Sequence, residues 1–413
     1  MTVLSLAACN AAKLALVPAS LKPRGAIAQP DLFFGQTLTL EEWEDTLRSQ
    51  IWSELQSSVY GIMPDDSTIS FTEKRVSDAE AFGTEVHLEE IVFDATASYN
   101  GVQKRTRPLQ INIIYPKKAS GPVPVIMMQT FCPNYNTFPH PFVSPPPGSH
   151  FSCNGDGIVN GMFGYVFGRY ITTPPIETIL ERGYAIMTMH PPLAIPDRSQ
   201  GGLSALRELS EGHDDDNSRW GTIGAWAWLW SRAIDVIEND PRIDQDGLIA
   251  YGHSRYGKSA LVAGAYDPRI DVVIAHQSGT GGASLSRDKP GETVEDITAA
   301  YPHWFTKKYA EVANDPSQLP IDQHHLLALI APRPLLLGNA RRDIWSDPNG
   351  GFRAAQAANK AYNLYGSNGL EQSRLNEFNP QDDVAVWIRP GTHGVVKEDW
   401  PAFLQFLDAH LKK

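Results

Sequence analysis

The sequence predicts an α/β protein built on a mostly parallel β-sheet, and three observations carry that prediction. Strand-like apolar runs alternate with helix-like segments through the second half of the 413-residue chain, as they do in βαβ units. An earlier run, residues 123–130, is continuously apolar, which is typical of strands covered on both faces. Hydrophobic residues make up 42 % and charged residues 20 % of the chain, so a sizeable core is available and wholesale disorder is excluded.

The N-terminal part should contain a tail and then a helix. Residues 1–36 are rich in Ala, Pro and Leu without sustained periodicity, so we expect a leader or a loosely packed tail. Over about residues 39–61, Thr39 can cap a helix, acidic residues fill its first turn and apolar residues recur at helical spacing. Residues 37–413 are expected to form a single domain that begins with this helix.

The rest of the chain supplies the sheet and its covering helices. Residues 84–97 and 108–116 alternate between apolar and polar side chains, which predicts antiparallel strands, whereas the apolar run 123–130 predicts a covered strand. Residues 131–180 are full of Pro, Gly, Asn and aromatic residues, and are expected to be an ordered loop insertion. Beyond it we expect strands at 184–190, 248–253, 272–276, 334–340 and 384–390, and helices at 174–183, 222–240, 257–266, 351–366 and 399–411.

Charge and composition limit the partners and cofactors. The formal net charge is −12 at pH 7, so the average surface repels phosphate backbones and anionic lipids, and nucleic acid is not expected as a partner. No run approaches the roughly 20 apolar residues that cross a bilayer, so no membrane span is expected. The acidic stretch 213–217 lacks the alternating oxygen ligands of a calcium loop, and no metal is expected. We expect a monomer.

The three cysteines bear on the compartment. Cys9, Cys132 and Cys153 are too few for a disulfide scaffold and lack zinc-ligand spacing. Cys132 and Cys153 lie in one loop-rich region and could pair if the protein is exported, although the sequence does not supply the geometry. "LSLAAC", which ends at Cys9, resembles a bacterial lipobox, but only eight residues precede the cysteine and none is basic. We expect a secreted or periplasmic protein, with Cys9 either a lipoprotein anchor or a chance match.

One stretch, "LIAYGHSRYGKSALVAGAYDP" over residues 248–268, indicates a nucleophile. A strand ends there, Ser254 follows, and a helix begins directly. Such a sharp strand-to-helix turn exposes a serine hydroxyl beside a base and requires small neighbours, here Gly252 and Gly257. The second glycine comes three residues after the serine rather than two, so the match to the G-x-S-x-G pattern is incomplete.

The order of residues along the chain strengthens this interpretation. Asp343 follows the predicted strand 334–340, and His393 follows the predicted strand 384–390. Enzymes of the α/β-hydrolase fold place serine, acid and histidine in this order, each after a later strand. Ser254 would then be the nucleophile, His393 the base and Asp343 the acid that orients the imidazole. The alternative is that these residues are a helix cap, a surface turn residue and a loop histidine.

Two cations lie beside the proposed nucleophile. Arg255 follows Ser254 directly, and Lys258 comes four residues after Ser254, on the same helix face. Positive charge at a helix start opposes the helix dipole, so a purely decorative role is disfavoured. The two cations instead suit an oxyanion in need of stabilisation and a substrate rich in oxygen atoms.

These residues resemble a known family. "GHSRYGKSALVAGAYDPRI" is similar to the signature of the glucuronoyl esterases, carbohydrate esterase family 15, and the similarity continues through "RWGTIGAWAW", "SGTGGASLSRDKPGETV", "YPHWF", "DQHHLLALIAPRP", "DIWSDPNG" and "GTHG". The resemblance covers roughly residues 180–410 and, more loosely, 40–130. It implies an α/β-hydrolase with a three-layer αβα sandwich, no metal and no organic cofactor. It also implies Arg255 as an oxyanion stabiliser, and Lys258, Glu292 and Trp345 as ligands of uronate hydroxyls.

The chain departs from that family at one important position. Fungal members carry the triad glutamate before an S-G pair, in a segment that matches "IAHQSGTGG", and this chain has Gln277 there. Glutamine is uncharged and cannot stabilise an imidazolium as a carboxylate does. The acid must therefore come from the later strand, as Asp343 or, failing that, Asp347. The insertion at 131–180 also departs from the family pattern, so the leaving-group side of the pocket is not predicted.

The resulting hypothesis is a serine-type carboxylic ester hydrolase that cleaves esters of 4-O-methyl-glucuronic acid in glucuronoxylan, such as lignin–carbohydrate ester links. A first alternative is an esterase for other sugar esters, such as methyl uronates or acetylated xylan. Lys258, Glu292 and Trp345 favour a uronate, because an acetyl group offers nothing to three polar contacts. A second alternative is a catalytically weak carbohydrate-binding protein of the same fold, which only the glutamine at 277 supports.

Overall fold

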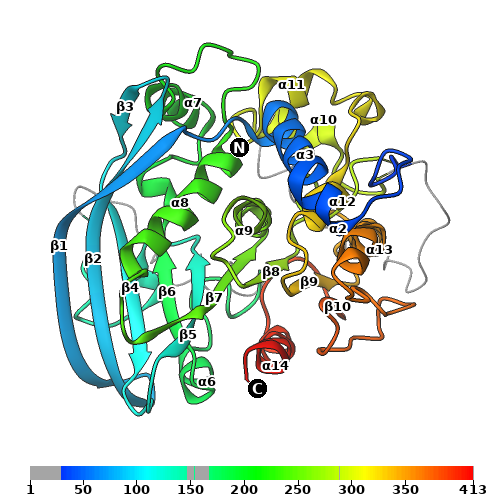
Figure 1. Ribbon diagram of the computed structural model, residues 1–413. Helices are drawn as coiled ribbons and strands as arrows, with labels where there is room; N and C mark the ends of the chain where they lie inside the picture. The colour runs from blue at the N-terminus through cyan, green and yellow to red at the C-terminus, as the bar shows by residue number, and fades with distance from the viewer. Residues whose placement is uncertain (1–28, 147–152, 154–166, 288, 413) are drawn as a thin grey trace.

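The architecture is a ten-stranded mixed sheet between two layers of helices (Figure 1). The computed structural model describes residues 29–146, 153, 167–287 and 289–412. Along the sheet the strands follow the order β1-β2-β4-β6-β5-β7-β8-β9-β10, and β3 pairs with β2. The pairs from β6 to β10 are parallel, and those among β1, β2, β3, β4 and β6 are antiparallel. The predicted fold class, an α/β protein with a mostly parallel sheet, is confirmed.

The strands match the predicted runs, with two additions. The strand β1 was not predicted, because its mostly exposed, polar side chains give it little apolar alternation; it is held by a long antiparallel register with β2, from Asp66 opposite Ser98 to Ala81 opposite Thr84. The short β3 was also missed. The bounds are β1 (Asp66–Ala81), β2 (Thr84–Tyr99), β3 (Val102–Arg105), β4 (Leu109–Pro116), β5 (Val123–Gln129), β6 (Ala185–Met189), β7 (Ile243–His253), β8 (Val272–His276), β9 (Leu335–Ala340) and β10 (Val384–Arg389).

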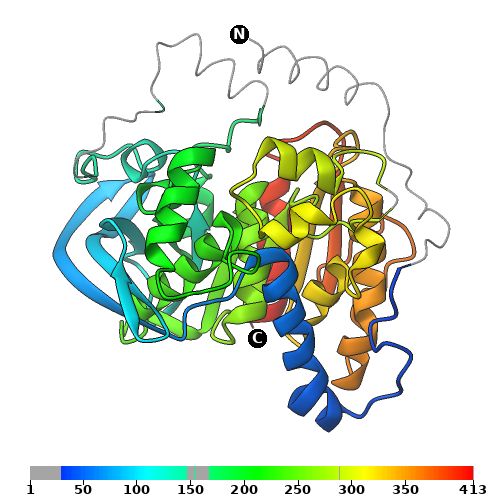
Figure 2. The ribbon, with the colours of Figure 1, turned by 90° about the horizontal axis from the view of Figure 1, so that it is seen from above.

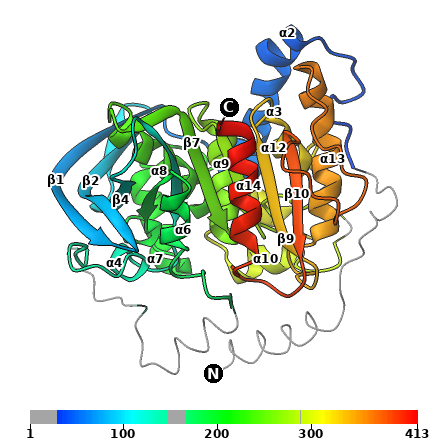
Figure 3. The ribbon, with the colours of Figure 1, turned by 90° about the horizontal axis from the view of Figure 1, so that it is seen from below.

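The side chains of the central strands divide into two cores, one on each face of the sheet. On β7, Ala250 belongs to the larger core and Ile249 to the smaller, and on β8 the same division separates Val273 from Ile274. The larger core is covered by α3 (Arg48–Leu55), α8 (Thr222–Ile237), α9 (Arg255–Tyr266), α12 (Gln323–Ala328) and α13 (Pro348–Leu364). The smaller is covered by α6 (Ile176–Glu181) and α14 (Asp399–Leu411), and α14 lies across the sheet in the view from below (Figure 3).

The N-terminal helical segment lies beside α13, as the views from above and below both show (Figures 2 and 3). It begins at α2 (Leu40–Glu42), where Thr39 and Glu42 form a capping box, and π-helical turns join it to α3 and extend it to Tyr60. The predicted helix and its cap are therefore confirmed. The end of the expected tail is packed rather than loose, since Leu32 and Phe33 are buried in the core. Residues 1–28, which include Cys9, lie outside the described residues.

The expected insertion at 131–180 is described only in part, because residues 147–152 and 154–166 lie outside the described chain. Its described part contains the short helix α4 (Asn134–Thr137) and a disulfide between Cys132 and Cys153, whose Cα atoms are 5.8 Å apart.

None of the helices that the structure describes is long and apolar enough to cross a membrane. Three further helices are α7 (Ser199–Leu209), α10 (Val294–Ala300) and α11 (Lys307–Glu311).

Candidate active site

Ser254 occupies a strained turn between β7 and α9. Its backbone angles are φ 57° and ψ −121°, a conformation that non-glycine residues rarely adopt and that recurs at functional sites. A side chain at Gly252 would collide with the main-chain carbonyl of Tyr256, which explains the need for glycine. The N–H of Ser254 donates to the carbonyl of His276 at the end of β8 (2.8 Å), so the turn is tied to the neighbouring strand. Ser254 itself is partly exposed to solvent.

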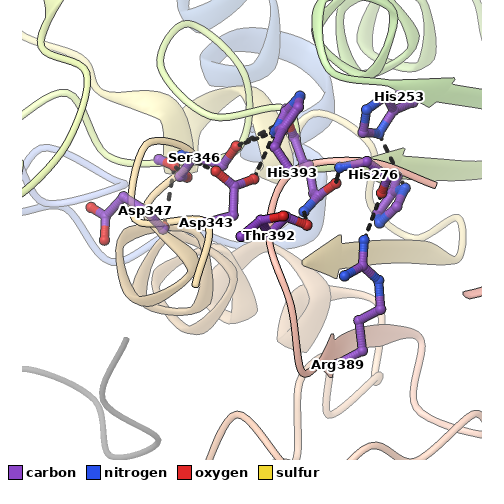
Figure 4. Close-up of polar contacts among 12 residues, drawn as sticks. His253, His276, Asp343, Ser346, Asp347, Arg389, Thr392 and His393 are labelled. Atoms are coloured by element: carbon purple, nitrogen blue, oxygen red, sulfur yellow. Dashed lines mark hydrogen bonds and ion pairs between the residues drawn. The ribbon is translucent and has the colours of Figure 1, made fainter. Parts of the chain in front are cut away.

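Asp343 and His393, the predicted acid and base, are 50 residues apart in sequence and in direct contact in the fold (Figure 4). The carboxylate Oδ2 of Asp343 lies 2.7 Å from Nδ1 of His393, and the Asp343 side chain is fully buried. Burial by itself raises the pKa of this carboxyl, but the charge and hydrogen bond of His393, with further hydrogen bonds from Ser346, outweigh it and hold the pKa below its usual value. Asp343 therefore stays ionised beside the imidazole.

Asp347, the alternative acid, has a different position. Its side chain points away from His393 (Figure 4), and Oδ1 accepts the N–H of Gly350 (3.0 Å) at the start of α13. It therefore acts as the N-cap of that helix. The geometry separates the two candidate acids and favours Asp343.

The histidine loop lies beside the serine turn. The ring of His253, the neighbour of Ser254, packs against the ring of His393 with centroids 4.7 Å apart. His253 is buried, and its Nδ1 lies 3.2 Å from Nδ1 of His276 (Figure 4). Because Nδ1 of His393 is engaged by Asp343, Nε2 is the nitrogen left for the reacting hydroxyl. The loops after β7, β9 and β10 thus meet at one edge of the sheet, as expected for the carboxyl ends of parallel strands.

Arg255 is held by a carboxylate and by aromatic rings. Its guanidinium forms an ion pair with Asp197, and it lies 5.0 Å from the ring centroid of Trp304 and 5.7 Å from that of Phe131. Oδ1 of Asp197 also accepts from Nε1 of Trp304 (2.8 Å) and contacts Nε2 of His303 (2.9 Å). Arg255 therefore belongs to a built polar cluster and does not decorate a solvated helix start. Asp197 was not predicted, because nothing in its surrounding sequence indicates a partner 58 residues away.

Lys258, Glu292 and Trp345 are brought together. Lys258 is only 4 % exposed, and its Nζ donates to the carbonyl oxygens of Ser278 and Thr280, the latter at 2.7 Å. Burial lowers the pKa of Lys258 to about 8, and the charge of Glu292 partly offsets this effect. Burial also raises the pKa of Glu292, against the charge of Lys258 and a hydrogen bond from Trp345. A partly desolvated cation and carboxylate side by side form a polar site suited to hydroxyl groups.

Two cavities adjoin Arg255 and His393, respectively. The larger, of about 950 Å³, starts at Arg255 and Tyr256 and extends past Phe131 toward α7, with Arg107 and Arg198 in its wall. The smaller, of about 370 Å³, adjoins His393 and includes Phe167 and Arg389. Among the described residues, no group of three or more His, Cys, Asp or Glu side chains could hold a metal ion.

Comparisons with known proteins relate this chain to esterases. A sequence profile described as "Glucuronyl esterase, fungi" matches residues 213–366. The carbohydrate esterase MZ0003 of an unknown prokaryotic organism is 32 % identical over 382 residues, which cover 90 % of this chain and 86 % of that protein. The 4-O-methyl-glucuronoyl methylesterase of Hypocrea jecorina is 36 % identical over 156 residues, 35 % of this chain and 34 % of that enzyme.

Solved structures extend the similarity to nearly the whole chain. A promiscuous CE15 esterase from a marine bacterial metagenome superposes with a TM-score of 0.79 at 29 % identity, over 94 % of this chain and 98 % of that one. A glucuronoyl esterase from Solibacter usitatus superposes with a TM-score of 0.77 at 26 % identity, again over 94 % and 98 % of the two chains.

Proposed function

The chain belongs to the glucuronoyl esterases, carbohydrate esterase family 15, and from this premise we propose that it hydrolyses 4-O-methyl-glucuronoyl esters by means of Ser254, His393 and Asp343. The observation that carries the proposal is the 2.7 Å contact between Asp343 and His393, beside a strained serine turn. A charged, buried acid on one imidazole nitrogen, with the other directed to the reaction, is the arrangement that activates a serine hydroxyl.

The reaction runs in two halves. The hydroxyl oxygen of Ser254 attacks the ester carbonyl carbon while Nε2 of His393 takes the hydroxyl proton, and a tetrahedral oxyanion forms. The bond to the alcohol then breaks, the alcohol leaves with the proton from His393, and an acyl-serine remains. Water repeats the sequence, with His393 again taking and returning a proton, and releases the uronic acid. Asp343 keeps its charge throughout and stabilises the imidazolium in each half.

Backbone N–H groups at the start of α9 and the guanidinium of Arg255 are the proposed donors to the oxyanion. Asp197 and the flanking rings limit the orientations open to this guanidinium, so it needs little reorganisation when charge develops on the substrate. A preorganised donor of this kind contributes more than a mobile one, because no ordering cost arises in the transition state.

Lys258, Glu292 and Trp345 are the proposed uronate ligands. The carboxylate of Glu292 accepts from sugar hydroxyls, and Nζ of Lys258, which donates to two carbonyls, keeps a third N–H for a hydroxyl oxygen. An acetyl ester has no groups for these contacts, so a uronate ester should be strongly preferred. The natural substrate we propose is glucuronoxylan, including its ester links to lignin alcohols.

The compartment we propose is outside the cytoplasm, secreted or periplasmic. The disulfide between Cys132 and Cys153 supports this, because such bonds persist mainly in oxidising compartments. A polymeric cell-wall substrate supports it as well, since polysaccharides of that size do not enter cells.

Hydrolysis of benzyl glucuronate and of a simple aryl acetate, by the wild type and by Ser254→Ala, tests this function. We expect a kcat/KM for the glucuronate that exceeds the value for the acetate, and loss of both activities in Ser254→Ala. Preference for the acetate would remove the glucuronoyl assignment but leave the serine mechanism. Inactivity of the wild type on both esters would favour a carbohydrate-binding protein.

A further inference from the structure

The side chain of Gln277 holds the main chain on both sides of His393. Its Nε2 donates to the carbonyl of Thr392 (3.3 Å), and its Oε1 accepts the N–H of Gly394 (2.8 Å). Gln277 is 1 % exposed, so these hydrogen bonds are shielded from water. Thr392 and His393 lie in the loop between β10 and α14, next to the buried histidines (Figure 4).

The main chain of Gln277 is hydrogen-bonded to other parts of the site. Its N–H donates to the carbonyl of Gly338 on β9 (2.8 Å), and its own carbonyl accepts the hydroxyl of Ser346 (3.2 Å), which neighbours Asp343 in the fold. Gln277 forms these bonds with a backbone φ of 50°, in the left-handed region that disfavours glutamine. Such a conformation persists only where the surrounding contacts determine it, and it concentrates at functional sites.

The backbone of the loop that carries His393 is bonded by Gln277 and also by Arg389, which donates to the carbonyls of Pro390 (3.0 Å) and Gly394 (2.7 Å). The segment "GTHG" has glycine at 391 and 394, both with positive φ (105° and 150°), so its backbone is conformationally permissive. Asp343 and the ring of His253 orient the imidazole, but both act on the side chain rather than on the backbone that carries it. Within the described residues, Gln277 is the side chain that bonds the backbone directly before and directly after His393.

We propose that Gln277 is a positioning residue, a main-chain clamp that sets the place of His393 relative to Ser254; this rests on the function proposed above. The clamp requires an amide, because the carbonyl of Thr392 needs a donor and the N–H of Gly394 needs an acceptor. An ionised glutamate, which the family resemblance places here in fungal members, offers acceptors only. The position that carries the acid in those enzymes therefore serves the base in this one, while Asp343 supplies the charge.

A matched pair of variants tests the clamp. Gln372 is also buried, at 5 % exposure, and forms the same pair of bonds with one backbone residue, since its Oε1 accepts the N–H of Val386 (2.6 Å) and its Nε2 donates to the Val386 carbonyl (3.0 Å). Gln277→Met and Gln372→Met should lower the melting temperature by similar amounts. Only Gln277→Met should reduce kcat, by about 10- to 100-fold, because a misplaced general base loses reactive geometry. KM should stay within about twofold in both variants.

The position of His393 can also be read without substrate. The proton between its Nδ1 and Asp343 should give a downfield proton NMR signal in the wild type and in Gln372→Met, shifted or lost in Gln277→Met. An unchanged signal with kcat within about twofold of the wild type, or an equal loss of kcat in Gln372→Met, would overturn the proposal. If Gln277→Met does not fold, Gln277→Asn takes its place, because asparagine tolerates the positive φ but its shorter amide does not span Thr392 and Gly394: a kcat at least about tenfold lower supports the clamp, and wild-type kcat refutes it.

Failure of the clamp and failure of the proposed substrate are distinguishable. All variants are assayed on both benzyl glucuronate and an aryl acetate. A wild type that cleaves only the acetate contradicts the glucuronoyl assignment, yet the effect of Gln277→Met on acetate turnover and on the NMR signal still decides the clamp.

Discussion

Replacing Asp343 with Asn should slow ester hydrolysis by about 10⁴-fold in kcat with little change in KM. Asn keeps the shape of the side chain but removes its charge, and it cannot stabilise the imidazolium that forms when His393 takes the serine proton. The Asp343 carboxylate is fully buried, so bulk water does not screen its interaction with His393.

The magnitude follows from the geometry. Opposite charges at the 2.7 Å separation of Oδ2 and Nδ1 attract by about 6 kcal/mol at the effective dielectric constant of roughly 20 that reproduces measured protein electrostatics. Each loss of about 1.4 kcal/mol in transition-state stabilisation costs a factor of ten. The full electrostatic contribution therefore corresponds to about four orders of magnitude in rate.

Steady-state kinetics on benzyl glucuronate measures this effect, with Asp347→Asn as the matched control. Asp347 caps α13, and asparagine caps helices as well as aspartate does, so Asp347→Asn should leave both the stability and kcat nearly unchanged, kcat within about twofold. Near-normal turnover in Asp343→Asn, or a larger kinetic loss in Asp347→Asn, would show that the acid has been wrongly assigned.

Three other predictions concern pH, covalent structure and packing. The pKa of Lys258 is lowered to about 8, so its ammonium is lost as pH rises through that value; KM for benzyl glucuronate should increase above about pH 8 in the wild type, and Lys258→Met should have a raised KM without this pH dependence. A constant wild-type KM up to pH 10, together with an unchanged KM in Lys258→Met, would exclude the cation as a ligand. The double replacement of Cys132 and Cys153 by Ser removes a cross-link between residues 21 positions apart, and it should lower the unfolding free energy measured in urea by about 3 kcal/mol. The wild type and the double variant should have equal unfolding free energies once the disulfide of the wild type is reduced. Gly252→Ala should cost about 1–3 kcal/mol and most of the activity, because its Cβ meets the carbonyl of Tyr256, whereas Gly121→Ala, with open space around it, should change neither.

Features with a local signature were predictable from the sequence. The covered strands follow from their continuous apolar runs, and the crowding of glycines around Ser254 follows from the tight turn there. The contact between Asp343 and His393 was accessible too, because parallel strands align their carboxyl ends and so place successive loops together.

Features that depend on distant partners were not predictable. The polar, half-exposed β1 is a strand because β2 pairs with it, and a half-exposed edge carries little apolar pattern. Asp197 is an ordinary loop acid until the fold brings Arg255 to it, and Gln277 looked like the loss of an acid until its partners at 392 and 394 were located. In each case the role of the residue depends on partners that lie tens of positions away in the sequence.

The place of β10 at the edge of the sheet has a consequence for the order of folding. Ser254 follows a central strand, whereas His393 depends on β10, which within the described residues pairs with β9 only and comes after every other strand of the sheet in sequence. Contacts between such distant segments raise the contact order and slow assembly. Catalysis is therefore the last property the chain acquires, and the return of esterase activity during refolding reports completion of the whole sheet rather than formation of its centre.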